Sequence, residues 1–511
     1  RLSLQRLARE KGVEEQVIFY NQFVSLEELI EFIGAADIYI TPYLNQAQIV
    51  SGTLAYTLGA GKAIISTPYW YAEEMLADER GVLVPFHDPK ALAGAVVDLM
   101  DHEAKRHAMR KRAYLYGRGM VWPQVARRYM ESFERARSGR RHFSLRTLTV
   151  KALDENPNEL PPLKLDHLRH MADETGMLQH AIFTVPNYHH GYTTDDNTRA
   201  LMVSTLLEEM GSAEALELAS RYLAFVWYAF NVETRRFRNF MDYQRRWLED
   251  SGSDDCHGRA LWALGTVLGR SNTPALHSMA GWLFEKALPP ILETTSPRAW
   301  AFALIGIHEY LRRFAGDRVA SQARDELAKR LLALYKNHRT DDWRWYEDVL
   351  TYCNAALPQA MLMSGQSISD NEMTQVGLES LQWLADLQRS AKGHFIPIGS
   401  NGFYPKGGTR ARFDQQPVEA QAMVSACLEA ARITSDASWR KEARGVFEWF
   451  LGRNDLNLPI YDPKTGGCRD GLHPDRANEN QGAESTLAYL QASLELRLSE
   501  NTLETKESPA Q

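Results

Sequence analysis

The chain has 511 residues, of which 44% are hydrophobic and 24% charged, a composition typical of a globular protein with two or three domains. Its net charge of −7 argues against nucleic acid as a partner, and no apolar run approaches the roughly 18 residues that a membrane helix needs. The four cysteines are widely spaced, which argues against a zinc site or a disulfide framework and favours the reducing cytoplasm, so we expect no bound metal.

Residues 1–135 alternate short β-branched runs with helical stretches. The chain begins without Met, partway into a predicted helix, from which we expect that upstream sequence is missing. The predicted strands are "QVIFY", "DIYITPY", "KAIIST" and "GVLVP". The predicted helices between and after them include "SLEELIEFIGAA", capped by Ser25 and Glu28, "SGTLAYTLGAG" and "DPKALAGAVVDLMD". This short alternation predicts a parallel sheet covered by helices.

A ligand site is expected where the second helix begins. Ser51, Gly52 and Thr53 follow a strand of the predicted sheet, and ligands of such sheets bind beyond the carboxyl ends of the strands. Backbone N–H groups at a helix start hold phosphate groups, and glycine lets a ligand approach the backbone. The alternative is that Ser51 is only an N-cap. Glu73 and Glu74 are candidate ligands as well, or else glutamates that favour a helix start.

The same segment resembles the carboxyl-terminal half of a family 4 glycosyltransferase with the GT-B fold. The matching pieces are "VIFYNQFVSLEELIEFIGAADIYITPY", "LAYTLGAGKAIIST" and "AEEMLADERGVLVPFHDPKALAGAV", within residues 1–125. The resemblance implies a nucleotide-sugar donor, no other cofactor, and a Glu-x7-Glu motif that contacts the donor. Here the two positions hold Gln48 and Tyr56, and Tyr56 offers no carboxylate. Since the other half of the fold is expected to be missing, we do not expect this chain to transfer sugar by itself.

Composition changes after Glu134. Residues 136–160 include the basic "RSGRRHFSLR" and the Pro- and Asn-rich "DENPNELPP", which predicts a linker. Residues 501–511 are expected to be a disordered tail.

Residues 161–500 contain two alternating sets of six predicted helices. One set has a polar start followed by small and apolar residues, as in "TTDDNTRALMVSTLL" and "SDDCHGRALWALGTVL". The other set has charged faces and broad apolar stripes, as in "AEALELASRYLAFVWYAF". Six such pairs indicate an internal repeat and predict an (α/α)6 toroid with the first set inside, although an open α-solenoid remains an alternative. The whole chain is then an α/β Rossmann-like half of a GT-B fold followed by an all-α toroid.

The inner helices of a toroid run parallel, so their polar starts are predicted to form one site. Carboxyl pairs cleave glycosidic bonds, and aromatic rings stack on sugars, so we expect an oligosaccharide or polysaccharide substrate. The catalytic candidates are Glu347, Asp348, Asp414, Glu419, Asp196 and Asp255. The substrate-binding candidates are Asp195, Asp254, His189, His190, Tyr192, His257, Trp345, Tyr346, Arg412 and Glu479.

The general acid is expected in "WYEDVL" or "FDQQPVE", because apolar or acidic neighbours raise the pKa of a carboxyl group. The alternative is that these acids only cap helices or favour their first turns.

Residues 165–495 also resemble the six-hairpin glycosidase superfamily, and more closely the toroid fused behind family 4 glycosyltransferases in some bacterial proteins. The matching stretches are "LKLDHLRHMADETGMLQHAIFTVPN", "GYTTDDNTRAL", "FDQQPVEAQAM" and "NQGAEST". The resemblance implies carbohydrate binding, with hydrolysis or phosphorolysis as the reaction. Two alternatives remain open: a glycan-binding toroid without catalysis, and a sugar 2-epimerase that uses histidines, for which the candidates are His189, His257, His394 and His473.

Overall fold

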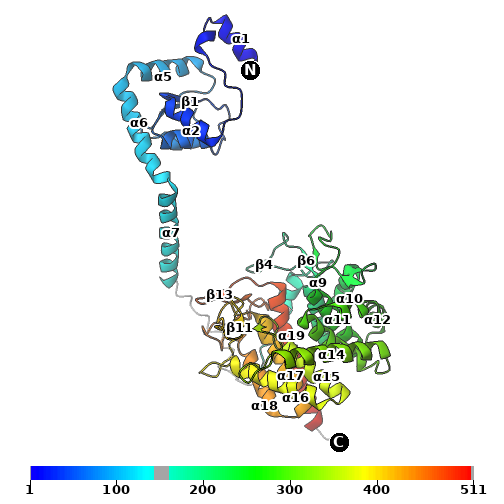
Figure 1. Ribbon diagram of the computed structural model, residues 1–511. Helices are drawn as coiled ribbons and strands as arrows, with labels where there is room; N and C mark the ends of the chain where they lie inside the picture. Colours follow the sequence, from blue (N-terminus) through cyan, green and yellow to red (C-terminus); the bar gives the residue numbers. More distant parts are fainter. Residues whose placement is uncertain (1, 143–159, 508–511) are drawn as a thin grey trace. The chain divides into compact units, whose positions relative to one another are not determined.

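The computed structural model describes residues 2–142 and 160–507. The chain divides into two compact units, Arg1–Thr149 and Val150–Gln511 (Figure 1). Each unit is described by itself below.

The N-terminal unit is built on a parallel sheet in the order β1 (Ile38–Thr41), β2 (Ala63–Ser66) and β3 (Val82–Leu83). Its helices are α1 (Leu2–Glu10), α2 (Leu26–Ala35), α3 (Gly52–Gly59), α4 (Trp70–Met75), α5 (Pro89–Asp101), α6 (Glu103–Gly117) and α7 (Trp122–His142), with 3₁₀ turns at Glu14–Gln16 and Arg118–Met120. Successive side chains of β2 point to opposite faces of the sheet. Ile64 packs with α3 and α4 on one face, whereas Ala63 and Ile65 pack with α5 and α6 on the other.

The local signals at the helix starts are confirmed. The Ser25 hydroxyl accepts a hydrogen bond from the Glu28 N–H (3.2 Å), and the Glu28 carboxylate accepts one from the Ser25 N–H (2.8 Å). Asp88 caps α5, with Pro89 as its first residue.

Three predicted boundaries in the chain differ from the structure. "QVIFY" forms no strand, since it has no hydrogen-bonded neighbour strand in the described residues and Ile18 is exposed. α7 continues to His142, where the linker was expected, and residues 143–159 of that linker lie outside the described residues. The last helix continues through residues 501–507, where the tail was expected to begin, and 508–511 are not described.

The C-terminal unit is a ring of helix pairs. Within residues 160–507, its six inner helices are α9 (Thr194–Glu209), α11 (Asp254–Arg270), α13 (Pro297–Leu311), α15 (Ala356–Ile368), α17 (Pro417–Thr434) and α19 (Ala483–Glu507). The outer helices are α10 (Ala215–Ala229), α12 (Pro274–Ala287), α14 (Arg318–His338), α16 (Asn371–Leu387) and α18 (Ala437–Phe447), with the short α8 (Asp166–His170) in the remaining outer position and a 3₁₀ turn at Pro289–Glu293.

The ring is closed. Each inner helix packs against the next, and α19 packs against α9. This contact excludes the open solenoid and confirms the predicted toroid. The inner helices are largely buried, whereas the outer helices bury only one side.

Short antiparallel strand pairs lie in the loops that precede the inner helices, and two of them, β6 with β9 and β10 with β11, join loops that are separated by a helix pair. They pair β4 (Ala181–Ile182) with β5 (Val185–Pro186), β6 (Tyr192–Thr193) with β9 (Phe240–Met241), β7 (Phe230–Asn231) with β8 (Arg236–Phe237), β10 (Val349–Leu350) with β11 (Tyr404–Pro405), and β12 (Gly471–Leu472) with β13 (Ala477–Asn478).

Glycines bring α11 and α13 into backbone contact. A Cβ added at Gly258 would lie 2.6 Å from the Ala299 carbonyl oxygen, and one at Gly265 would lie 2.0 Å from that of Gly306. Both residue numbers rise together along the contact, so the two helices run parallel.

Gly306→Ala is expected to lower the free energy of unfolding by about 3 kcal/mol, because the new methyl group would lie 2.4 Å from the Leu261 carbonyl oxygen. Chemical denaturation followed by tryptophan fluorescence measures the change. Gly281→Ala in α12 is the matched control, since a Cβ added at Gly281 contacts only a Leu268 methyl group, at 3.7 Å. The control is expected to be neutral or to gain up to about 1 kcal/mol. Equal losses in both variants would contradict the close contact.

Candidate functional site

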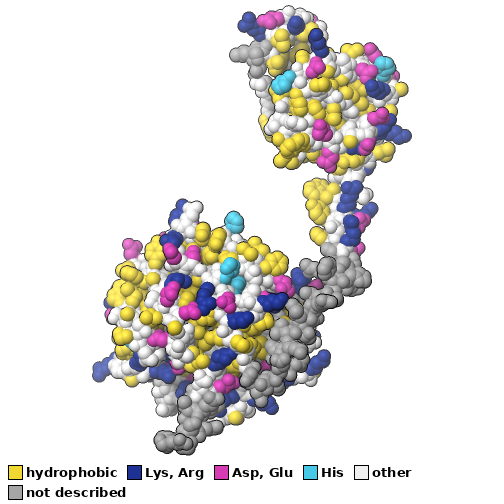
Figure 2. Space-filling view, turned by 180° about the vertical axis from the view of Figure 1, so that it is seen from behind, with side chains coloured by type: hydrophobic (Ala, Val, Ile, Leu, Met, Phe, Trp, Pro, Cys, Tyr) yellow, Lys and Arg dark blue, Asp and Glu magenta, His cyan; other side chains and the backbone are white. Residues whose placement is uncertain are grey.

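The starts of the inner helices meet at one end of the ring, where the loops that precede them supply polar side chains. Figure 2 shows one face of the C-terminal unit on which acidic, basic and histidine side chains lie among hydrophobic ones. The contacts below join residues from several of these loops, as the sequence pattern predicted.

Two buried guanidinium groups hold the starts of α9, α11 and α19 together. Arg199 lies 3.1 Å from the Asp195 carboxylate and 2.8 Å from that of Glu484. Arg259 lies 2.8 Å from the second oxygen of Asp195 and stacks over Phe302. The arginine side chains are only 4% and 5% exposed, whereas Glu484 is 43% exposed, so the carboxylates form the solvent side of the cluster.

A second cluster joins α11, α13 and the loop before α15. The Asp255 carboxylate accepts hydrogen bonds from the Ser296 hydroxyl (2.7 Å) and from the Tyr352 hydroxyl. Arg298, 4% exposed, lies 2.7 Å from the Glu347 carboxylate and donates to the Tyr352 carbonyl oxygen (2.6 Å). Glu347 is therefore engaged in an ion pair, and its carboxylate does not lie in an apolar setting.

Glu419 is a deeply buried acid at this end of the ring. It lies in the first turn of α17, is 3% exposed, and accepts hydrogen bonds from the backbone N–H of Cys353 and from the Asn354 side-chain amide (2.9 Å). Burial raises the pKa of Glu419 to about 7, and these hydrogen bonds offset only part of that effect. Glu419 therefore holds a proton close to neutral pH.

Two further acids of the site differ in exposure. Asp196 is 4% exposed and accepts a hydrogen bond from the Thr193 hydroxyl (2.6 Å). Burial and the adjacent Asp195 carboxylate raise the pKa of Asp196 to about 7. Asp414 remains accessible and lies 2.5 Å from Nδ1 of His473.

Four of the predicted substrate-binding side chains lie in the core. Trp345 and Tyr346 are fully buried against α16, where Tyr346 bonds Ser380 and Trp345 lies near Trp383. His257 is fully buried and bonds the Ala287 carbonyl oxygen, and burial lowers its pKa to about 4. Tyr192 is 1% exposed and donates to Asp173. These rings therefore contribute to packing. The sequence did not reveal this, because the same aromatic residue types occur in cores and on sugar-binding surfaces.

The remaining candidates lie at the edge of this end. Asp254 pairs with Arg236, Glu479 with Arg469, and Arg412 with Asp455. Asp348 is 71% exposed. His189 and His190 are exposed, and the His190 ring contacts that of His180.

Sequence reasoning missed the buried arginines. Arg199 and Arg259 each follow an aspartate by four residues, in "DDNTRAL" and "DDCHGRAL", and Asp195 pairs with Arg199 across one helical turn. That repeated spacing was the available signal. Tyr352, Cys353 and Asn354 carry no comparable pattern, since their role depends on contacts with α11 and α17.

A cavity of about 680 Å³ is lined by all six inner helices of residues 160–507, towards the opposite end of the ring. Arg270 bonds both oxygens of Glu309 (3.1 Å each) and contacts Glu209 (3.2 Å). Arg312 also contacts Glu309 (2.9 Å). The wall of this cavity is therefore charged and internally paired.

In the N-terminal unit, Ser51 caps α3 by accepting from the Leu54 N–H (3.3 Å), and Thr53 accepts from the Tyr39 hydroxyl (2.7 Å). Gly52 and Tyr56 are exposed beside them. Glu73 and Glu74 are exposed on α4. The N-cap gives Ser51 a structural role, and the exposed Gly52 leaves the surface of the helix start accessible.

Among residues 2–142 and 160–507, no group of three or more His, Cys, Asp or Glu side chains is placed to hold a metal ion. None of the helices described is long and apolar enough to cross a membrane.

Comparison with known proteins supports both parts of the fold. Residues 1–102 match a family model described as glycosyl transferases group 1. An uncharacterized glycosyltransferase from Methanocaldococcus jannaschii is 26% identical over 120 residues, which are 23% of this chain and 30% of that protein. The chain thus spans under a third of the length of this relative.

The solved structures similar to this chain include three sugar-converting enzymes. A cellobiose 2-epimerase from Bacillus thermoamylovorans has a TM-score of 0.52 at 12% identity, over 65% of this chain and 95% of its own. A sugar epimerase from a ruminal bacterium and a D-mannose isomerase each have a TM-score of 0.50 at 12% identity, over 66% and 65% of this chain and 97% and 94% of their own. At this identity the similarity establishes the fold alone. The chain thus combines a segment that matches the glycosyl transferases group 1 model with a helical toroid, as predicted.

Proposed function

We propose that the toroid binds a carbohydrate at the end where the inner helices begin and cleaves a glycosidic bond there, with Glu419 as the general acid. The observation that carries the proposal is Glu419 itself, a buried carboxyl group with a pKa of about 7 among the loops that form this end. A glycosidase needs one acid that is protonated near neutral pH and a second carboxylate.

Asp255 is proposed as the second carboxylate. The loop before α15 connects the two acids, since the Tyr352 side chain bonds Asp255 and the backbone of the next residue bonds Glu419. Arg199, Arg259 and Arg298 fix the surrounding carboxylates, and Asp195 and Glu484 present oxygens that accept hydrogen bonds from sugar hydroxyl groups. Such fixed polar groups orient a substrate before reaction.

A screen of oligosaccharides and polysaccharides with the full chain tests the proposal. Release of reducing sugar, or of sugar phosphate when phosphate is added, is the expected result. Binding of a glycan without any turnover would favour a glycan-binding toroid.

A second candidate function is epimerisation of a sugar, favoured by the His473–Asp414 contact of 2.5 Å. A carboxylate that orients an imidazole is a common arrangement for proton transfer. Exchange of a C2 proton with solvent deuterium, followed by NMR on cellobiose and mannose, distinguishes it from cleavage. Exchange that His473→Asn abolishes would assign epimerisation to this end of the ring.

For the N-terminal unit we propose binding of a nucleotide-sugar donor at the start of α3, in the setting of a larger bacterial glycosyltransferase. The match to the glycosyl transferases group 1 family and the open surface beside Ser51 and Gly52 support it. The four cysteines are buried and free, which suits the reducing cytoplasm proposed as the location.

Restoring two carboxylates is expected to strengthen donor binding. Gln48→Glu combined with Tyr56→Glu should tighten binding of UDP-glucose by about tenfold or more, because hydrogen bonds to charged groups contribute about 1.5–3 kcal/mol each. Calorimetric titration of the full chain measures the change. Tyr129→Glu, on exposed α7, adds one of the two charges elsewhere and should leave the affinity unchanged. Unchanged binding in the double variant would contradict the placement of the donor.

A further inference from the structure

A positively charged pocket lies at the edge of the ring, apart from the acids described above. Its volume is about 470 Å³, and it is formed by two parts of the connection between α16 and α17 and by the loop that follows α18. Its charged and titratable lining residues are Arg389, Lys392, Arg410, Arg412, His394 and Asp455. Four permanent cations thus face one carboxylate.

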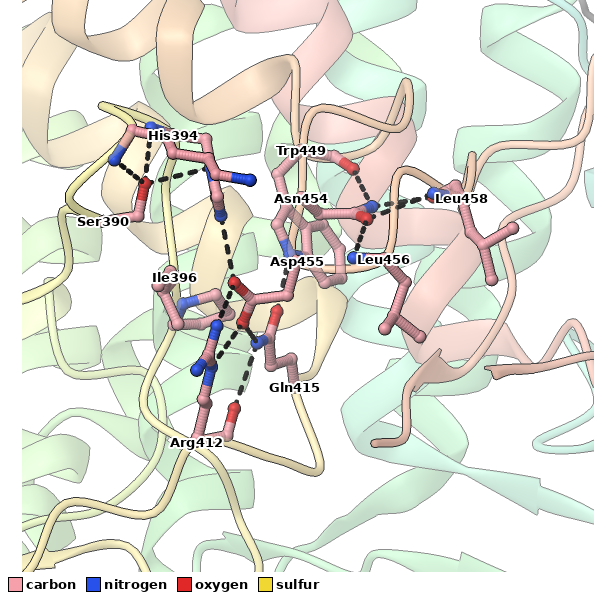
Figure 3. A network of polar contacts seen from close by, with 12 residues as sticks. Ser390, His394, Ile396, Arg412, Gln415, Trp449, Asn454, Asp455, Leu456 and Leu458 are labelled. Atoms are coloured by element: carbon pink, nitrogen blue, oxygen red, sulfur yellow. Dashed lines mark hydrogen bonds and ion pairs between the residues drawn. The ribbon is translucent and has the colours of Figure 1, made fainter. Parts of the chain in front are cut away.

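The single carboxylate is already fully engaged. Asp455 is 2% exposed and contacts Arg412 (3.0 Å), Nε2 of His394 (3.0 Å) and the side-chain amide of Gln415 (2.8 Å). Figure 3 shows these three side chains directed at its two oxygens. Asp455 therefore offsets Arg412 and has no oxygen left for a further cation.

Arg410 is held in place without being neutralised. Its guanidinium donates to the carbonyl oxygens of Leu387 and Ile396, its Nε is buried without a hydrogen-bond partner, and no carboxylate of the described residues lies within ion-pair distance. Burial lowers the pKa of Arg410, which reflects the cost of keeping this charge from water. The carbonyl oxygens orient the guanidinium, and the Asp455 carboxylate, which is engaged by other donors, offsets its charge only in part.

The neighbouring cations add to this excess. Lys392 is exposed, and its ammonium group makes no ion pair within the part of the chain that the structure describes. Arg389 pairs with Glu442 (2.8 Å) at the edge of the pocket. An oriented guanidinium beside a lysine is the arrangement that recognises a phosphoryl group, because the arginine offers paired donors and the lysine a mobile charge.

We propose that this pocket binds a phosphoryl group, either as inorganic phosphate or as the phosphate ester of a sugar, through Arg410 and Lys392. The proposal is independent of the function assigned to Glu419, since none of the residues that line the pocket belongs to the clusters around Asp195, Asp255 or Glu419.

Calorimetric titration of the full chain at constant ionic strength tests the proposal with three probes: inorganic phosphate, glucose 6-phosphate and glucose. Saturable binding of either phosphate compound but not of glucose is expected, and the tighter of the two identifies the source of the group. Arg410→Gln should weaken this binding by about tenfold or more, and Lys392→Gln by several-fold.

Arg313→Gln is the matched control, since Arg313 also donates to a carbonyl oxygen, that of Ser271, but does not line the pocket. It should leave phosphate binding unchanged. Because Arg410 ties two backbone segments, its variant is checked by circular dichroism, and the exposed Lys392 provides a variant that leaves the fold intact. Absence of phosphate binding, or binding that both pocket variants leave unchanged, would overturn the proposal.

Discussion

Glu419→Gln is expected to lower kcat for glycan cleavage by about 10²- to 10⁴-fold, the range by which a positioned proton donor contributes. The substitution keeps the size of the side chain, and its amide oxygen accepts one of the two hydrogen bonds that Cys353 and Asn354 donate to different oxygens of the carboxyl group. It removes the proton that a leaving group would receive. The ratio of kcat in variant and wild type, measured on the substrate found by screening, gives the effect.

Glu347→Gln is the matched control, because Glu347 lies at the same end of the ring but is paired with Arg298. It is expected to alter KM more than kcat. Near wild-type kcat in the Glu419 variant, or an equal loss of kcat in both, would refute the assignment of the acid.

The pH dependence follows from the same residue. Wild-type kcat should fall as the pH rises above about 7, because Glu419 then loses its proton. Its folded pKa is raised from 4.5, so the native state holds a proton that the unfolded chain releases, and the free energy of unfolding decreases as the pH rises from about 4.5 to about 7. The part of this decrease that is due to Glu419 is on the order of 3 kcal/mol and should be absent in Glu419→Gln, whereas the part due to Asp196, whose pKa is also raised to about 7, should remain.

Arg270→Met is expected to destabilise the toroid by about 3 kcal/mol. The Glu309 side chain is 8% exposed, and the substitution removes its bidentate partner in the wall of the cavity that the inner helices line. Removing one partner of a buried ion pair leaves the other charge uncompensated, which costs more than the pair itself contributes. Urea denaturation of the wild type and the variant measures the difference.

The double variant Arg270→Met with Glu309→Met separates charge from packing. It should recover much of the lost stability, since the charges that lose a partner, Glu209 and Arg312, are solvent-exposed and no buried charge is left unpaired. Burial raises the pKa of Glu309, but Arg270 and Arg312 more than offset this and hold it below its usual value. In the single variant Glu309 can take up a proton more easily, so the destabilisation should shrink at low pH. A loss that is the same at pH 5 and pH 8 would contradict this account.

Local chemistry made much of the fold predictable. The reciprocal bonds of Ser25 and Glu28, and Asp88 before Pro89, depend on residues a few positions apart and are visible in the sequence. The small residues of the inner helices likewise indicate close packing, which Gly265 and Gly306 realise. "QVIFY" has the composition of a strand, but a strand also needs a neighbour, which composition does not provide.

The candidate site was predictable only in its position. Acids at the helix starts identified the end of the ring, and Glu419 was among them. Whether an acid is free or paired depends on contacts between distant residues, such as Glu347 with Arg298 and Glu484 with Arg199. For the same reason the buried position of Trp345 could not be distinguished from a place on the sugar-binding surface.

The contact between α9 and α19 has a consequence for how the toroid folds. The residues that it joins are separated by most of the C-terminal unit, as Arg199 and Glu484 illustrate. An open array of repeats gains stability one unit at a time. Here the side of α9 that packs against α19 stays uncovered until α19, the sixth inner helix of residues 160–507, is synthesised. Pairing of such distant segments slows folding, because the intervening chain must be ordered first. We therefore expect the nascent toroid to expose the side of α9 that α19 covers until translation of the unit is almost complete, a state in which transiently exposed surface favours aggregation.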